Sequence, residues 1–250
     1  MDLAEKTLNI NRHPWELSRT KCVLSILKKY ILNTVVDIGA GDRFFISKLR
    51  SFISGKAYAV DVGYNKLEVI DGIHCLNNTQ DIPKLNGGGA IIMMDVLEHI
   101  EDDKSFLNEI LEKISKDTIV FITVPAFQKL FSSHDVFLKH HRRYNKQQLL
   151  TLIHSCNLDV ERCHYFYMSL FFARWVSLLF KKEKSTNDEI GIGGWNFSDK
   201  HIITRIIYTI LNIDFCTCAF FAKFNIYLPG LSFLAICKLQ RGLGEIHNNF

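Results

Sequence analysis

Three short segments of the sequence carry side chains or glycines that could do chemistry: DIGAG at 37–41, DVLEHIED at 95–102 and SSHDVFLKHHRRYN at 132–145. The first contains Gly-x-Gly, which lets the backbone turn sharply and approach a ligand without a Cβ. The other two supply carboxylates, imidazoles and guanidinium groups, which bind charged ligands, transfer protons or hold metal ions. Composition does not decide among these uses. The position of each segment in the fold has to decide which use applies.

The glycine segment indicates an adenosine-bearing cofactor. It follows a β-branched apolar run at 34–38 and precedes a helical pattern, so the free N–H groups of a helix start would face the ligand. Asp61 lies 20 residues after Gly41, where a second strand is expected to end. An acid at this place can accept hydrogen bonds from both hydroxyls of a ribose.

Phe44 and Asp37 indicate which adenosine cofactor fits. The dinucleotide fingerprint needs a glycine or alanine where this chain has Phe44, and the chain has no Tyr-x-x-x-Lys, so a nicotinamide-dependent oxidoreductase is the alternative and not the main prediction. Asp37 adds a negative charge just before the loop, which suits a cationic ligand better than a diphosphate. S-adenosylmethionine carries a sulfonium and an ammonium group and no phosphate.

Alternating strands and helices must position these segments. We expect strands at 34–38, 56–62, 72–76, 90–94, 118–124, 158–165 and 231–239, and helices at 15–32, 44–52, 103–114 and 146–155. This alternation predicts an α/β fold with a doubly wound, mostly parallel seven-stranded sheet and a helical insertion before the last strand. Ligands of such sheets bind at the carboxyl ends of the strands, so the three segments should face one crevice.

DIGAG, Asp61 and DVLEHIED, in this order and spacing, resemble the motifs of class I S-adenosylmethionine-dependent methyltransferases, closest to the branch that includes the ubiquinone and menaquinone methyltransferases. The resemblance covers roughly residues 13–165 and implies a Rossmann-like methyltransferase fold with S-adenosyl-L-methionine as cofactor. The loop would surround the methionine moiety, Asp61 would hold the ribose and Val62 would pack against adenine. The cofactor-binding residues implied are Asp37, Gly39, Ala40, Gly41, Asp61, Val62, Asn78, Thr79, Asp95, Val96 and Leu97.

Asn78 departs from the family pattern, and an N-terminal pattern adds further residues to the predicted cofactor site. Asn78 stands where the family often has an acid that accepts from the adenine amino group, although an amide oxygen can also accept. Near the N-terminus, an H-x-W…R pattern formed by His13, Trp15 and Arg19 is expected to close over the cofactor.

Glu98 and His99 allow two interpretations that the sequence leaves open. In the first, one of them lies near the methionine end or the acceptor, which makes His99 a candidate catalytic residue. In the second, the acids at 98 and 101–103 favour a helix N-terminus.

The segment 132–145 starts seven residues after Pro125 and is expected to hang over the carboxyl ends of the strands, where it meets the acceptor. It matches an S-x-H-D…H-x-R-R-Y signature of uncharacterised bacterial methyltransferases in the same branch. If the acceptor is a hydroxyl, His134 paired with Asp135, or else His140, could take its proton. Arginine offers a fixed fork for an anionic acceptor. The candidate catalytic residues are therefore His134, Asp135, His140, Arg143, Tyr144 and His99.

Three other interpretations of this segment compete with acceptor recognition. A metal site of His134, Asp135 and His140 lacks a second Cys/His pair at ligand spacing, so we expect no metal. A nucleic-acid patch needs more basic charge, and the net charge of +4 argues against nucleic acid as a partner. Arg142 and Arg143 could also be solvated, or cap the preceding loop through salt bridges.

The last third of the chain is expected to differ from the rest. The apolar segments 165–180 and 202–224 favour a helical subdomain or a dimer interface over a lid or a peripheral membrane contact through 165–229. Arg174, Lys181, Lys182 and Lys184 would suit an anionic membrane surface. The expected organisation is an N-terminal helical segment (1–33), an S-adenosylmethionine-binding core (34–164), an apolar helical insertion (165–230) and a closing strand with a tail (231–250).

Cysteine usage and the N-terminus indicate where the protein works. Seven cysteines without a CxxC, and no signal-peptide pattern, predict a cytoplasmic protein, or one peripheral to the inner face of a membrane. The predicted reaction is methyl transfer to a small-molecule, lipid-linked or glycan acceptor, at an oxygen. The alternatives are the oxidoreductase and a non-catalytic cofactor-fold adaptor; the oligomeric state is left open.

Overall fold

The computed structural model describes residues 11–180, 197–198 and 200–240 of the chain. The predictions for Lys181, Lys182 and Lys184, for residues 1–10 and for the tail 241–250 lie outside the described residues.

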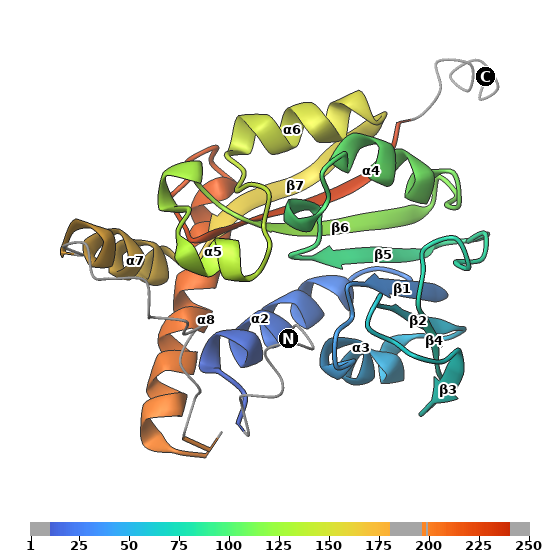
Figure 1. Ribbon diagram of the computed structural model, residues 1–250, viewed down its shortest axis with the longest axis horizontal. Coiled ribbons are helices and arrows are strands. Elements are labelled where there is room, and N and C mark those ends of the chain that lie inside the picture. The colour runs from blue at the N-terminus through green and yellow to red at the C-terminus, as the bar shows by residue number, and fades with distance from the viewer. Residues whose placement is uncertain (1–10, 181–196, 199, 241–250) are drawn as a thin grey trace.

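A single twisted sheet crosses the molecule (Figure 1). Its strands are β1 (Thr34–Ile38), β2 (Ala57–Val60), β3 (Glu68–Ile70), β4 (Ile73–Leu76), β5 (Gly89–Met94), β6 (Thr118–Pro125), β7 (Leu158–Phe166) and β8 (Ser232–Leu239). They lie in the order β3-β4-β2-β1-β5-β6-β8-β7. β1 pairs in parallel with β2 on one side and β5 on the other, and β8 runs antiparallel to β6 and β7. The predicted α/β fold with a mostly parallel sheet is confirmed.

The prediction of seven strands missed β3. This strand pairs antiparallel with β4 across a two-residue turn, Asp71-Gly72, in which both residues have positive φ (51° and 73°). Asp-Gly is the preferred sequence for such a hairpin turn because both central residues must adopt left-handed backbone angles. The dipeptide was therefore a usable signal, although β3 has only three residues.

Ten helical segments lie within the part of the chain that the structure describes. They are α2 (Pro14–Leu27), α3 (Phe44–Leu49), η1 (Arg50–Phe52), η2 (Leu97–His99), α4 (Asp103–Leu111), η3 (Gln128–Leu130), α5 (Ser133–Phe137), α6 (Lys146–Ser155), α7 (Met168–Phe180) and α8 (Ile202–Ala222). Local chemistry explains several starts: His13 accepts from the Trp15 amide ahead of Pro14, and Asn145 and Gln148 form a capping box on α6. α2 ends earlier than the predicted residue 32, with turn-type bonds at Lys29 and Tyr30.

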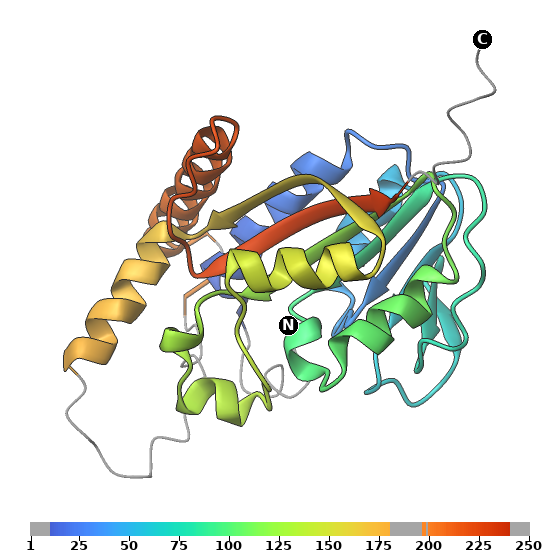
Figure 2. The same ribbon diagram turned by 90° about the horizontal axis from the view of Figure 1, so that it is seen from above.

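Two layers of helices cover the two faces of the sheet, and each face has its own core. Figure 2 shows α4 and α6 on one side and α2 and α8 on the other. Alternate residues of β1 point to opposite faces: Val36 joins the core under α4 and α6, and Val35 joins the core under α2, α3 and α8. β1 lies between β2 and β5, where the strand order reverses, and in doubly wound sheets ligands bind at the carboxyl ends of the strands next to this point.

The apolar insertion forms α7 and α8. α8 packs on α2 and β7 through residues that include Leu211 and Phe215, and Asp214 accepts two hydrogen bonds from Ser169 at the start of α7 (both 2.7 Å). α7 extends away from the sheet (Figures 1 and 2). Of the helices that the structure describes, α8 alone is long and apolar enough to cross a membrane, a criterion of length and composition only.

Candidate active site

The glycine loop after β1 is held close to the segment that follows β5. Gly39 and Gly41 have φ values of +71° and +51°, and a Cβ on Gly39 would lie 2.7 Å from Cγ2 of Val96. The amides of Gly39 and Ala40 donate to the Val60 carbonyl (2.8 and 3.1 Å), which fixes the loop against the end of β2. Glycine is required here because the backbone angle and the close approach both exclude a side chain.

Asp61 lies at the tip of β2, where an acid was expected. Its carboxylate accepts from the amides of Gly41 (2.8 Å) and Gly63 (2.9 Å), so the glycine loop and the acid share one edge of the crevice. Val62 beside it is 93% exposed. A hollow of about 460 Å³ lies elsewhere, on α8. A second one, of about 330 Å³, opens next to Asp61 and is lined by residues 41–43, 63–66 and 68. The second hollow is the one adjacent to the predicted cofactor residues.

Asn78 and Thr79 are engaged with protein groups. Asn78 accepts from the Asp81 amide (2.9 Å) and donates to the Asp81 carboxylate (2.6 Å). The Thr79 hydroxyl donates to Glu109 (3.3 Å). The Asn78 oxygen has a second lone pair, so its contact with adenine stays a prediction.

Helix α2 and the residues just before it contribute two arginines to one side of the crevice. Arg19 is ion-paired with Asp95, which has a φ of +58° just after β5 and also accepts from the Thr123 hydroxyl (3.2 Å). The Arg19 guanidinium lies 4.6 Å from the centre of the Trp15 ring. Arg12 pairs with Asp42 in the glycine loop. The H-x-W…R pattern therefore lies beside the predicted cofactor residues.

Asp37 is buried at the carboxyl end of β1. Burial raises the pKa of Asp37 to about 7, because a carboxylate away from water is costly. A cation bound nearby would stabilise its charged form.

Asp135 is the centre of the 132–145 segment. It is fully buried and accepts from Nδ1 of His140 (3.0 Å), from Nε of Arg143 (2.7 Å) and from the amide of Ser132 (2.9 Å). These donors lower the pKa of Asp135, against the opposing effect of its burial. The hydrogen-bonded imidazole is thus that of His140. Nδ1 of His134 is buried and has no hydrogen-bond partner among the described residues, and burial lowers the pKa of His134.

Arg143 and Tyr144 hold the segment in place and do not line an open cleft. Arg143 is 7% exposed, and its guanidinium donates to Asp135 and to the Ala126 carbonyl. Tyr144 is buried with its hydroxyl 2.7 Å from Asp103. Because Nε and Nη1 of Arg143 are used within the protein, the contact of Arg143 with an anionic acceptor stays a prediction. Arg142 pairs with Asp103 (2.8 Å), as the salt-bridge interpretation expected.

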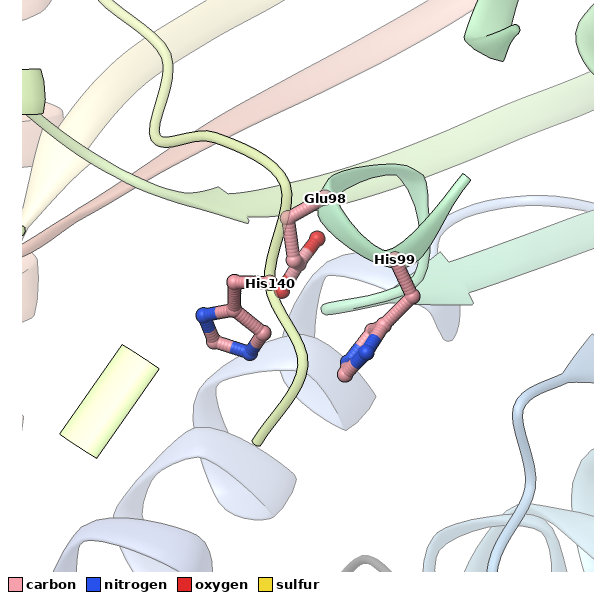
Figure 3. Close-up of side chains that lie close together, drawn as sticks. All are labelled: Glu98, His99 and His140. Atoms are coloured by element: carbon pink, nitrogen blue, oxygen red, sulfur yellow. The ribbon is translucent and has the colours of Figure 1, made fainter. Parts of the chain in front are cut away.

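Glu98, His99 and His140 converge at the carboxyl end of β5 (Figure 3). Glu98 and His99 come from η2, and His140 comes from the loop before α6. The two imidazole rings meet edge to face at 4.6 Å. One ligand atom from each residue lies within 4.8 Å of the others. The sequence indicated Glu98 and His99 as a pair but did not place His140 beside them.

Glu98 is the least expected member of this group. It is completely buried, and in the part of the chain that the structure describes neither carboxylate oxygen has a hydrogen-bond partner. Burial, and then the nearby Asp95, raise the pKa of Glu98 well above its usual range. Its carbonyl accepts from the His141 amide (2.7 Å), which ties η2 to the 132–145 segment.

Comparisons with known proteins place the fold. No protein-family model matches the sequence, and no curated protein matches it. Among solved structures, a chain of the Haloferax volcanii complex that contains the Trm112 methyltransferase activator is similar at a TM-score of 0.55 (14% identity, 90% of each chain covered). An S-adenosylmethionine-dependent methyltransferase from Archaeoglobus fulgidus matches at 0.50 (15% identity, 88% of this chain and 94% of that one).

The same fold also carries other chemistry. The [4+2]-cyclase SpnF matches at a TM-score of 0.51 (11% identity, 90% of this chain and 82% of that one). The fold is therefore the Rossmann-like fold of S-adenosylmethionine-dependent methyltransferases, and at these identities it does not fix the reaction. None of these structures singles out the ubiquinone and menaquinone branch.

Proposed function

We propose that the chain is an S-adenosylmethionine-dependent methyltransferase that acts on a small-molecule, lipid-linked or glycan acceptor, at an oxygen. The observation that carries the proposal is the edge formed by the glycine loop and Asp61, whose carboxylate lies 2.8 Å from the Gly41 amide. This acid accepts from ribose hydroxyls once a nucleoside displaces its contacts with the protein. The buried Asp37 beside it favours a cationic ligand.

The start of α3 argues against a dinucleotide. The Phe44 amide donates to Asp42 (3.3 Å), so the helix N-terminus already holds a carboxylate. The Arg12 guanidinium covers the Phe44 ring at 3.7 Å from its centre. A pyrophosphate here would meet both a negative charge and a phenyl ring, whereas S-adenosylmethionine has no phosphate to place.

The acceptor side is formed by His99, His134 and His140. Methyl transfer is an in-line displacement: the acceptor oxygen attacks the methyl carbon, the carbon–sulfur bond breaks and S-adenosylhomocysteine leaves. The enzyme contributes mainly positioning and desolvation. A hydroxyl acceptor must also lose its proton, and His140, with Nδ1 held by Asp135, is the best-oriented imidazole to receive it.

Ligand binding tests the cofactor assignment. In a thermal-shift panel, S-adenosylmethionine and S-adenosylhomocysteine should raise the melting temperature, and NAD and NADP should not. Asp61→Asn should weaken S-adenosylhomocysteine binding at least tenfold by calorimetry. Asp159→Asn, an exposed aspartate on β7, is the matched control and should bind normally. A shift with NAD alone would favour the oxidoreductase, and cofactor binding without any methyl transfer would favour the adaptor.

The exposed face of α8 supports a lipid-linked acceptor. Ile206, Ile210 and Ile213 lie on successive turns of one side of the helix, Phe220 lies two turns further along the same side, and all four are exposed. Exposed Arg205 and Lys223 flank this stripe, and the acid of α8, Asp214, is buried on the opposite side. An apolar stripe bordered by cations suits the interface of an anionic bilayer.

Vesicle binding tests this part of the proposal. The protein should co-sediment with phosphatidylserine-containing vesicles, and Ile213→Ser combined with Phe220→Ser should abolish it. The control variant is Ile31→Ser, at an isoleucine after α2 that is 78% exposed, and it should still co-sediment with these vesicles. If the wild-type protein ignores vesicles but forms a dimer that the double variant breaks, the face is a subunit interface.

A further inference from the structure

We propose that Glu98, His99 and His140 form a binding site for a divalent transition-metal ion. The structure brings a buried carboxylate from η2, its neighbouring imidazole and an imidazole from the loop before α6 to one place (Figure 3). One carboxylate and two imidazoles are donors that suit zinc, iron, cobalt or manganese, and they suit magnesium or calcium less well. This set differs from the His134, Asp135 and His140 group that the sequence raised.

Glu98 is the first observation that indicates a ligand. A carboxylate without exposure and without a hydrogen-bond donor in the described residues is costly unless it is protonated or paired with a cation. A metal ion would supply that charge. A packing role alone would be met by an apolar side chain at lower cost.

The surroundings of His140 are the second observation. Asp135 is buried between Arg143 and His140, so it is an ionised acceptor and Nδ1 of His140 must carry the proton. This leaves Nε2 as the nitrogen that can bind a metal. A carboxylate that orients a ligating histidine through its other nitrogen is the usual outer partner of a metal site.

The backbone keeps the ligands together. The His141 amide donates to the Glu98 carbonyl (2.7 Å), so the two ligand-bearing segments are joined within one residue of each ligand. Ligand atoms around a tetrahedral zinc ion lie about 3.3 Å apart. The atoms here lie within 4.8 Å of one another, so modest side-chain rotation would close the site.

Three protein ligands leave coordination positions open. Their use by an oxygen of the acceptor is a role that rests on the proposed function. There the metal would lower the pKa of the acceptor hydroxyl, and its proton would pass to His134 or water, because Nε2 of His140 would be occupied.

Cobalt(II) is the probe for the test, because its visible absorption reports coordination directly. Full-length protein stripped with EDTA should bind one equivalent, and zinc(II) should displace it. Glu98→Gln keeps the shape of the side chain and should weaken cobalt binding at least tenfold. Asp135→Asn removes the carboxylate that orients His140, together with its ion pair to Arg143, and should weaken cobalt binding about 10–100-fold. His141→Ala removes an adjacent exposed imidazole and should change the affinity less than twofold.

The outcomes separate this inference from the proposed function. No cobalt above background, or equal cobalt affinity in wild type and Glu98→Gln, would overturn the metal site. Because Glu98→Gln could alter folding, its circular dichroism and its S-adenosylhomocysteine affinity are measured in parallel, and both should match the wild type. If the wild-type protein binds S-adenosylhomocysteine but not cobalt, the metal site is wrong and the proposed function is unaffected. If it binds cobalt but not S-adenosylhomocysteine, the proposed function is wrong and the metal site is unaffected.

Discussion

Arg19 of α2 is ion-paired with Asp95, the first residue after β5. The two residues are 76 positions apart in the chain, and their contact fastens the N-terminal helix across the carboxyl end of the sheet. Arg19 also stacks on Trp15, so the guanidinium is held on two sides. The helix thus forms a wall of the proposed cofactor site.

This pair should contribute measurably to stability. The side chains of Arg19 and Asp95 are 11% and 32% exposed, between a surface pair and a buried one. A double-mutant cycle with Arg19→Met and Asp95→Asn, followed by urea unfolding, should give a coupling free energy of about 1–2 kcal/mol.

A second pair of the same chain provides the comparison. Lys238 and Glu161 lie 3.1 Å apart on the sheet edge, with side chains 46% and 40% exposed. Their cycle should give less than about 0.5 kcal/mol, because solvent screens exposed charges. Equal coupling in the two cycles would show that the Arg19–Asp95 contact does not fasten the helix.

Asp37 should make the ligand-free protein less stable as the pH rises. Its folded pKa, about 7, is above the ordinary 3.8, so its contribution is fully present below pH 3.8 and is lost as the pH rises toward 7. Asp37→Asn should therefore raise the free energy of unfolding at pH 8, by at most about 4 kcal/mol, and should weaken S-adenosylmethionine binding. Asp159→Asn should do neither.

Urea unfolding at pH 5 and pH 8 measures the change in the free energy of unfolding, and calorimetry measures the change in S-adenosylmethionine affinity. The two changes have opposite signs for one substitution, as expected where a charge is kept for its ligand and not for the fold. A variant that is less stable at pH 8 would contradict the prediction.

His164 should produce the opposite pH dependence. It is buried in β7, its Nδ1 lies 2.8 Å from the Tyr165 carbonyl and its ring meets Phe215 at 5.1 Å. Burial lowers the pKa of His164 to about 4, so its contribution is fully present above pH 6.5 and is lost as the pH falls toward 4.

The stability of the wild type should therefore fall relative to His164→Leu by about 2 kcal/mol between pH 7 and pH 5. His154→Gln alters an exposed histidine and should leave the slope unchanged. If wild type and His164→Leu lose stability in parallel over this range, the buried imidazole is not the cause.

The hydrogen bond between His140 and Asp135 can be observed without knowing the acceptor. Nitrogen-edited NMR of imidazole-labelled protein should show a protonated Nδ1 on His140 that exchanges slowly with water. Asp135→Asn should remove this tautomer preference, and Arg143→Lys should weaken it because the Nε donor that fixes Asp135 is lost. Arg142→Lys should have no effect, since Arg142 contacts Asp103 instead. An Nε2-protonated His140 in the wild type would contradict this assignment.

The sequence was sufficient for the sheet and the glycine loop because both depend on local patterns. Short β-branched runs predict buried strands, and Gly39 and Gly41 satisfy backbone angles that other residues rarely adopt. β3 was missed because three residues give too little periodicity, although Asp71-Gly72 marked the turn.

The acceptor side was less predictable because its geometry comes from contacts between segments. Arg143 looks like a ligand-binding residue in the sequence, and only tertiary packing shows that it is 7% exposed and bound to Asp135. Likewise Glu98 at a helix start is ordinary in sequence. Its burial depends on the 132–145 segment folding over η2, 34 or more residues later in the chain.

The tie between the His141 amide and the Glu98 carbonyl has an evolutionary consequence. The His141 side chain is exposed, and only its main chain joins η2 to the loop. In a saturation library selected for activity, position 141 should therefore accept nearly every amino acid and reject proline, which lacks the N–H. Position 141 would therefore vary widely among related sequences, and proline would be the one residue absent from it.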